Sequence, residues 1–197
     1  MDISSALSGL QETGVATGIR DSLLLFPLIE AVHVIGLALV FGTIAIIDLR
    51  LLGAASTRRS FRRMSAEIMK WTWAAFALTA LTGVLMFITN ATVYYNNLYF
   101  RAKIALLVLA AINVAVFELT AGRSMQQWDR APSAPRIGRL VATVSLVVWI
   151  GVIVTGRMIG FTATRATTEP APVEINFEDL LGLPAGGGEP QQAPGNE

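Results

Sequence analysis

The stretch Trp71-Thr-Trp-Ala-Ala-Phe-Ala-Leu-Thr-Ala-Leu-Thr-Gly-Val-Leu-Met-Phe-Ile-Thr89 carries no charged residue. Its length is close to the roughly 20 apolar residues that a helix needs to cross about 30 Å of hydrocarbon. Three further stretches, near residues 23–47, 102–121 and 140–162, have a similar length and composition. The sequence therefore predicts an all-α fold, an integral membrane four-helix bundle over residues 23–162.

The overall composition agrees with a membrane protein and excludes several functions. Apolar residues make up 53% of the 197 residues and charged residues only 15%, against about a quarter in a typical soluble domain. The mean hydropathy is +0.57. With no cysteine and one histidine, a single chain can form no disulfide, thiolate metal site or multi-histidine metal site. The formal net charge of +1 does not indicate a nucleic-acid partner.

The basic residues predict the orientation of the chain. Ten of the fifteen Lys and Arg residues fall in the segments that join the first span to the second and the third to the fourth. Loops rich in Lys and Arg stay in the cytoplasm. We therefore expect both termini on the outer, periplasmic side of a bacterial inner membrane, in a multi-pass protein.

The two ends of the chain differ from the spans. Ile3, Leu7 and Leu10 recur at helical spacing, which favours a short outer interfacial helix within residues 1–22. Residues 163–197 are acidic and rich in Pro and Gly, a composition typical of a disordered tail. Within this tail, residues 173–183 mix acids with large apolar side chains. They could dock an external partner or only retain residual structure.

Ionisable side chains inside a span are costly to bury, so each is a candidate functional residue. A rise of 1.5 Å per residue places one polar cluster in the outer half, made of Glu30, His33, Lys103, Asn113 and Arg157. A second polar set lies near the inner surface: Asp48, Arg50, Glu118 and Arg123. One interpretation is structural: Glu30 pairs with Arg157, or secondarily with Lys103, and His33 bonds Asn113 or a backbone carbonyl. The other interpretation is a ligand or proton site.

His33 is the candidate cofactor ligand. Glu30-Ala-Val-His33 supplies one Glu-x-x-His motif, whereas a di-iron carboxylate bundle needs two. Haem b would need a second axial ligand, either Met86 or Met158 or a second chain, and copper could use His33 with methionine sulfur. The sequence contains no catalytic constellation, so we predict no catalytic residues.

Several segments resemble a known family. Leu25-Phe-Pro-Leu-Ile-Glu30-Ala-Val-His33-Val-Ile-Gly36, Gly42-Thr and Asp48-Leu-Arg50-Leu-Leu-Gly53 are similar to the opening of the bacterial membrane proteins grouped as domain-of-unknown-function family 6644. Looser similarity extends over Asn90–Asn97, Phe100–Lys103, Trp128-Asp129 and Gly156-Arg157-Met-Ile-Gly. The resemblance covers about residues 22–161 and implies a four-helix inner-membrane protein without an activity to transfer. Members often place a histidine late in span three, where this chain has Glu118, which argues against transferring a histidine-based cofactor site.

We therefore predict a small polytopic inner-membrane protein, a non-enzymatic subunit or accessory protein with a polar site in the outer half. The alternatives are a redox protein that binds haem b or copper through His33, and a small transporter or proton pathway that uses Glu30 and Arg157. The predicted partners are the lipid bilayer and either other membrane subunits or a second copy of the chain.

Overall fold

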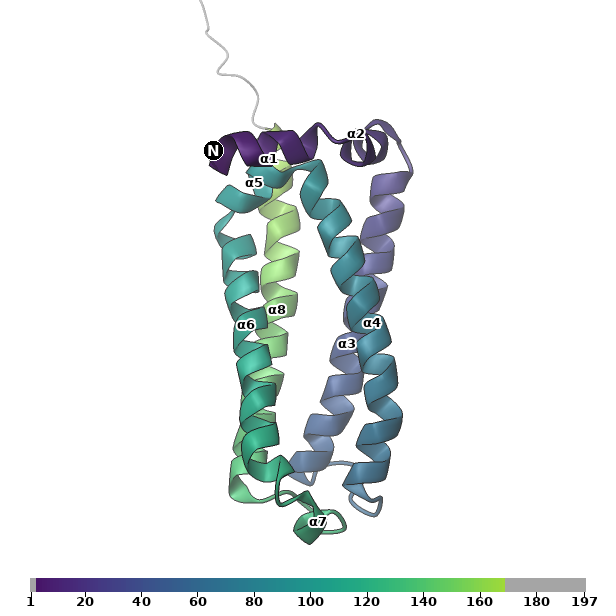
Figure 1. Ribbon diagram of the computed structural model, residues 1–197, viewed down its shortest axis with the longest axis vertical. Helices are drawn as coiled ribbons and strands as arrows, with labels where there is room; N and C mark the ends of the chain where they lie inside the picture. The colour runs from purple at the N-terminus through teal and green to yellow at the C-terminus, as the bar shows by residue number, and fades with distance from the viewer. Residues whose placement is uncertain (1–2, 169–197) are drawn as a thin grey trace, which may run out of the picture.

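The computed structural model describes residues 3–168, with side chains from 3 to 162. Four long helices run side by side (Figure 1): α3 (Leu25–Leu52), α4 (Phe61–Thr89), α6 (Leu98–Phe117) and α8 (Arg136–Thr168). Each is long and apolar enough to cross a membrane. The shorter elements are α1 (Ile3–Gln11), α2 (Gly14–Asp21), α5 (Ala91–Asn96), the π-helical turn η1 (Glu118–Gly122) and α7 (Met125–Trp128). The chain is thus a multi-pass membrane protein with a four-helix bundle.

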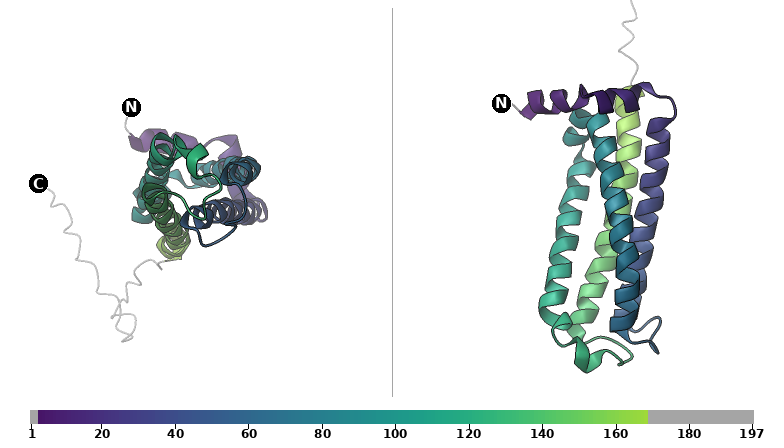
Figure 2. Two further views of the ribbon diagram at one scale, coloured as in Figure 1. Left: turned by 90° about the horizontal axis from the view of Figure 1, so that it is seen from below. Right: turned by 45° about the vertical axis from the view of Figure 1, so that its right-hand side comes forward.

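The two ends of the bundle are built differently. Helices α1, α2 and α5 lie across one end, which we call the α1 end, and α7 with its loops closes the opposite end, the α7 end (Figures 1 and 2). Helix α8 finishes at the α1 end (Figure 1). Both ends of the described chain therefore lie at the same end of the bundle. The interfacial position expected for residues 1–22 stays a prediction.

The helices extend beyond the apolar runs. Helix α4 begins at Phe61 rather than near Trp71, and the Ser60 side chain caps it by accepting from the backbone N–H of Arg63. Charged residues favour helix once they lie outside the hydrocarbon, so the helix continues into water. Helix α8 reaches Thr168, so the predicted disordered tail begins with helical residues 163–168. The remainder of that tail, with residues 173–183, lies outside the described residues.

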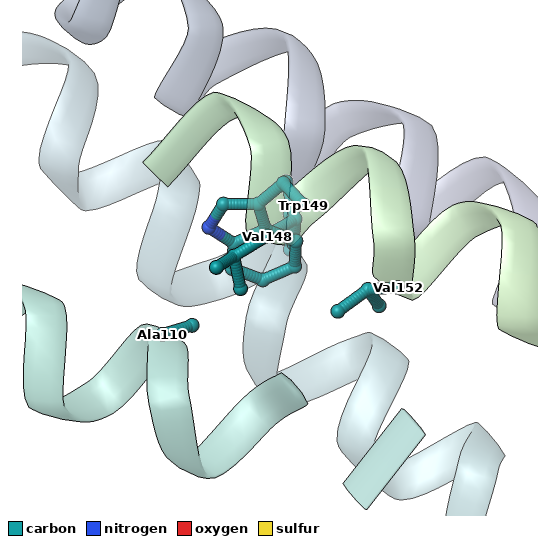
Figure 3. Packing of buried hydrophobic residues seen from close by; sticks show 6 residues of the cluster. Ala110, Val148, Trp149 and Val152 are labelled. Atoms are coloured by element: carbon teal, nitrogen blue, oxygen red, sulfur yellow. The ribbon is translucent and has the colours of Figure 1, made fainter. Parts of the chain in front are cut away.

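One apolar layer holds the four helices together at mid-height. Helix α3 packs on α4 and α8, and α6 packs on α8, whereas α4 and α6 make few contacts with each other. The layer, called here the Trp149 layer, contains one or more residues from each helix: Val40, Ala75, Ala110, Val148, Trp149 and Val152. Figure 3 shows Trp149 with Val148 and Val152 of α8 next to Ala110 of α6. The Trp149 layer separates the polar side chains of the α1 half of the bundle from those of the α7 half.

Candidate functional site

Arg50 is fully buried at the α7 end, with none of its surface exposed. Its guanidinium donates five hydrogen bonds of 3.0–3.3 Å to backbone carbonyls. These carbonyls belong to Arg59 in the loop before α4, and to Asp129, Ala131 and Pro132 in the loop before α8. Nη2 shares its two N–H groups among three of these contacts, and Nε and Nη1 make one each. Because a buried guanidinium needs several acceptors, these carbonyls hold Arg50 in place and Arg50 ties the two loops together.

Asp129 fixes the start of α4 from the other loop. Its carboxylate accepts from the Ser60 hydroxyl at 2.7 Å and from the backbone N–H of Arg62 at 2.7 Å. The N–H of Arg62 and the Ser60 hydroxyl lower the pKa of Asp129 below its usual range, with a smaller contribution from nearby arginines. The Phe61 ring packs beside Trp128, 5.1 Å between centroids. The contacts of Arg50, Asp129 and Phe61 thus form a closure of the α7 end, in which the two loops are joined to each other and to the start of α4.

Two of the residues predicted at the inner surface lie on the outside of this closure. Glu118 is exposed at the start of η1. Arg123 is also exposed and borders an open surface hollow together with Arg62 and Asp129. Neither joins Arg50, whose partners are all backbone carbonyls.

In the α1 half, the imidazole of His33 is held against α4. Its Nδ1 atom lies 3.0 Å from Oγ1 of Thr82. The single proton of that hydroxyl points to helix carbonyls, the nearer being that of Leu78 at 2.8 Å, so Thr82 accepts and His33 donates. The carbonyl of Thr79 also hydrogen-bonds the ring. Nδ1 therefore carries the proton and Nε2 keeps the lone pair.

Two glycines make room for this contact between α3 and α4. A Cβ atom added to Gly83 would lie 3.0 Å from Cε1 of His33 and 3.5 Å from its Nδ1. A Cβ atom added to Gly36 would overlap Oγ1 of Thr79. Small residues let membrane helices approach closely. The two glycines let α3 and α4 approach closely. This close approach and the contact with Thr82 together position the His33 ring.

Lys103 reaches the same region from α6. Its Nζ atom lies 3.6 Å from the position of a Cβ atom at Gly156 of α8, and its charge acts on the His33 imidazole. Within residues 3–162, Asp48 Oδ2 is the only fully enclosed side-chain N or O atom that lacks a hydrogen-bond partner. His33 and Lys103 are both partly buried, and neither Nε2 of His33 nor Nζ of Lys103 is among the enclosed atoms without a partner.

Glu30 and Arg157 are apart from this pair. Arg157 is exposed and its guanidinium lies over the Phe161 ring, 4.8 Å from the centroid. Glu30 is exposed as well and acts on Tyr94, whose pKa is raised first by burial and then by this carboxylate. The expected Glu30–Arg157 ion pair is not formed between these described residues, because Arg157 extends along its own helix instead of across to α3.

Asn113 lies on the other side of the Trp149 layer. It is buried, and its Nδ2 donates to the carbonyl of Val141 at 3.1 Å. Of the two partners that the sequence suggested for His33, Asn113 is not one, whereas a backbone carbonyl, that of Thr79, does bond the ring, together with the Thr82 hydroxyl. Among the five residues of the predicted outer-half cluster, the interaction seen in the described structure is the electrostatic action of Lys103 on His33.

The residues of α4 that hold His33 were not predicted from the sequence, although their spacing contains a signal. Four threonines, Thr72, Thr79, Thr82 and Thr89, are spaced seven, three and seven residues apart. This spacing places them on one face of a helix, and three of the four are buried. Because the stretch Trp71–Thr89 contains no charged residue, the positions of ionisable residues could not identify these threonines.

In the described part of the chain, no three His, Cys, Asp or Glu side chains are grouped so that they could hold a metal ion.

Comparison with known proteins gives one match. The model of a family described as of unknown function, DUF6644, matches residues 24–162. No curated protein and no solved structure matches the chain.

Proposed function

Because the chain belongs to the DUF6644 family, which is described as of unknown function, we propose its function from its own residues. The protein is a non-enzymatic membrane subunit that binds an anionic group bearing a hydroxyl, through His33 and Lys103. The observation that carries this proposal is the orientation of His33. Thr82 fixes the proton on Nδ1, so Nε2 is left as an acceptor, and the charge of Lys103 acts on the same ring.

The two groups define the chemistry of the ligand. An acceptor lone pair on Nε2 needs a hydroxyl or amine donor, whereas the ammonium of Lys103 needs an oxygen acceptor and favours negative charge. A phosphate ester with a free hydroxyl meets both requirements, as does a hydroxylated carboxylate. The ligand could be the headgroup of an anionic lipid or a free organic anion, and the test below separates these sources.

A second candidate function is metal or haem binding at Nε2, and one observation favours it. Metal-bound histidines usually donate their other ring N–H to an oxygen, as His33 does to Thr82. The neighbouring ammonium of Lys103 works against a cation at this position by charge repulsion. We therefore favour an anionic ligand over copper or haem b.

We expect Lys103→Met to weaken binding of an anionic lipid by about tenfold or more, the usual consequence of losing a hydrogen bond to a charged group. The measurement is retention of phosphatidylglycerol by the purified protein, counted by native mass spectrometry after transfer from mixed phosphatidylglycerol and phosphatidylcholine nanodiscs. His33→Asn should also lower retention. Lys70→Met is the matched control, because Lys70 is exposed near the α7 end.

The outcomes distinguish a lipid headgroup from a free organic anion as the ligand. Retention that falls in Lys103→Met but not in Lys70→Met supports a lipid ligand. Equal retention in all variants, together with a His33 resonance shifted by glycerol phosphate in pure phosphatidylcholine nanodiscs, supports a free anion. Absence of both effects contradicts the proposal. A Soret absorption band that is lost in His33→Asn would establish haem binding instead.

We also propose that the α7 end faces the cytoplasm of a bacterial inner membrane. Nine exposed basic residues support this orientation: Arg58, Arg59, Arg62, Arg63, Lys70, Arg123, Arg130, Arg136 and Arg139. Positive charge near span ends is retained in the cytoplasm. The His33 and Lys103 site then lies in the outer half of the membrane.

Alkaline phosphatase fused after Glu197 is expected to be active, because this enzyme folds only in the periplasm. The same reporter fused after Arg59, at the α7 end, should be inactive. Activity in intact cells, normalised to the amount of fusion protein, is the measurement. The reverse pattern would overturn the orientation.

A further inference from the structure

The α7 half of the bundle contains buried polar side chains that the proposed site does not use. Asp48 of α3, Asn113 of α6 and Ser145 of α8 have exposed fractions of 5%, 8% and 8%. Asn113 bonds the carbonyl of Val141, one helical turn before Ser145, and the Ser145 hydroxyl hydrogen-bonds the Asp48 carboxyl. Three helices therefore bring oxygen and nitrogen atoms to one level of the bundle.

Within this group, Asp48 has an unsatisfied atom. Its Oδ2 is fully enclosed and has no hydrogen-bond partner in the described structure. Burying an ionised carboxylate is very costly unless a cation or several donors compensate its charge. Ser145 supplies one hydroxyl, which is too little for a carboxylate with an enclosed, unbonded oxygen.

No cationic side chain compensates Asp48 in the part of the chain that is described. The groups that act on this carboxyl are its apolar surroundings and Ser145. On the packed elements, the nearest charged residues are Arg50 on α3, Glu67 and Lys70 on α4, Glu118 at the end of α6 and Arg139 on α8. All of them except Arg50 are exposed, and Arg50 donates to backbone carbonyls.

From this arrangement we propose that Asp48 is a proton-binding site, a carboxylic acid that takes its proton from water at the α7 end. In the acid form, Oδ1–H donates to the Ser145 hydroxyl, and Oδ2 becomes a carbonyl oxygen. An unbonded carbonyl oxygen costs far less to bury than a charge. A hydronium ion of the solvent loses the proton and becomes water, and the proton forms one O–H bond on the carboxylate.

Its place in the fold supports exchange with the α7 end. Asp48 lies one turn before Leu52, where α3 ends. The π-helical turn η1 begins five residues beyond Asn113, and such turns often occur at functional positions. The Trp149 layer separates Asp48 from His33, which is about 22 Å away along α3. The inference therefore stands independently of the proposed ligand site.

The test is infrared difference spectroscopy of the full-length protein in nanodiscs, with mildly acidic buffer exchanged for alkaline buffer. A protonated carboxylic acid has a carbonyl stretch well separated from that of a carboxylate. We expect this band in the wild type at mildly acidic pH, its loss at alkaline pH, and its absence from Asp48→Asn at both. Asp21→Asn, which changes an exposed aspartate, is the matched control and should keep the band.

The melting temperature is a second measurement, which shows whether the Asp48→Asn variant folds. Asparagine resembles the neutral acid in shape and charge, so Asp48→Asn should fold with a melting temperature close to that of the wild type in mildly acidic buffer. Ser145→Ala should shift the frequency of the band, because the acid loses its acceptor. A wild-type protein without the acid band would overturn the inference. So would a melting temperature that sodium chloride raises relative to choline chloride only when Asp48 is present, since a metal cation would then occupy the site.

Discussion

Replacing Arg50 by methionine is expected to destabilise the protein by at least about 3 kcal/mol, because each partly buried carbonyl left without a donor costs about 1–3 kcal/mol. Arg50 serves four carbonyls in two loops. The loss would be a large part of the roughly 5–15 kcal/mol that stabilises a typical protein. Thermal unfolding in detergent, followed by loss of the monodisperse peak, measures the effect.

The matched control for this prediction is Arg58→Met. Arg58 is exposed in the same loop, and surface substitutions usually change stability by less than about 0.5 kcal/mol. If both variants unfold at the wild-type temperature, the two loops are held by something other than Arg50. Lysine at position 50 should rescue little, because an ammonium cannot reproduce the planar fork of donors.

The second large effect is expected for Gly36→Ala in α3. Its new methyl group would overlap Oγ1 of Thr79, and overpacking of this kind typically costs about 1–3 kcal/mol. Separation of α3 from α4 would also release the His33 ring from Thr82. We expect a lower melting temperature together with weaker phosphatidylglycerol retention.

Helix α3 offers its own control for this change. Gly42→Ala adds the same methyl group where no atom lies within 4 Å, and alanine favours helix over glycine. This variant should be as stable as the wild type or slightly more stable. The double variant Gly36→Ala with Thr79→Ala removes the overlapping atom and should recover part of the loss. An unstable Gly42→Ala would show that glycine matters here for another reason.

The architecture could be predicted from the sequence because hydrophobic length is a local property. The uncharged stretch Trp71–Thr89 predicts a membrane-spanning helix, and the structure contains four helices of this kind. Residue counting places Asn113 at the level of His33, but Asn113 lies beyond the Trp149 layer and bonds Val141 of α8. The level of a side chain and the face that it occupies both depend on how the helices pack against each other.

The contacts of individual polar residues could not be predicted from the sequence either. Opposite charges at similar depth suggested that Glu30 and Arg157 would pair, but both are exposed and Arg157 packs on Phe161. The partner of His33 is an uncharged threonine, which carries no signal on a scale of hydropathy. Arg50 bonds only main-chain carbonyls, and the loop conformations that present them are set by the whole α7 end.

The most direct test of the proposed site is the protonation state of the His33 ring. The chain contains one histidine, so nitrogen-15 NMR of histidine-labelled protein, purified without a histidine tag, reports this ring alone. We expect the proton on Nδ1 and the lone pair on Nε2, with Thr82→Val disturbing this state and Thr72→Val, a buried threonine on the same helix, leaving it unchanged. A ring protonated on Nε2 instead, or a ring whose protonation does not change in Thr82→Val, would contradict the proposed site, because Nε2 would then not be available as an acceptor for a ligand.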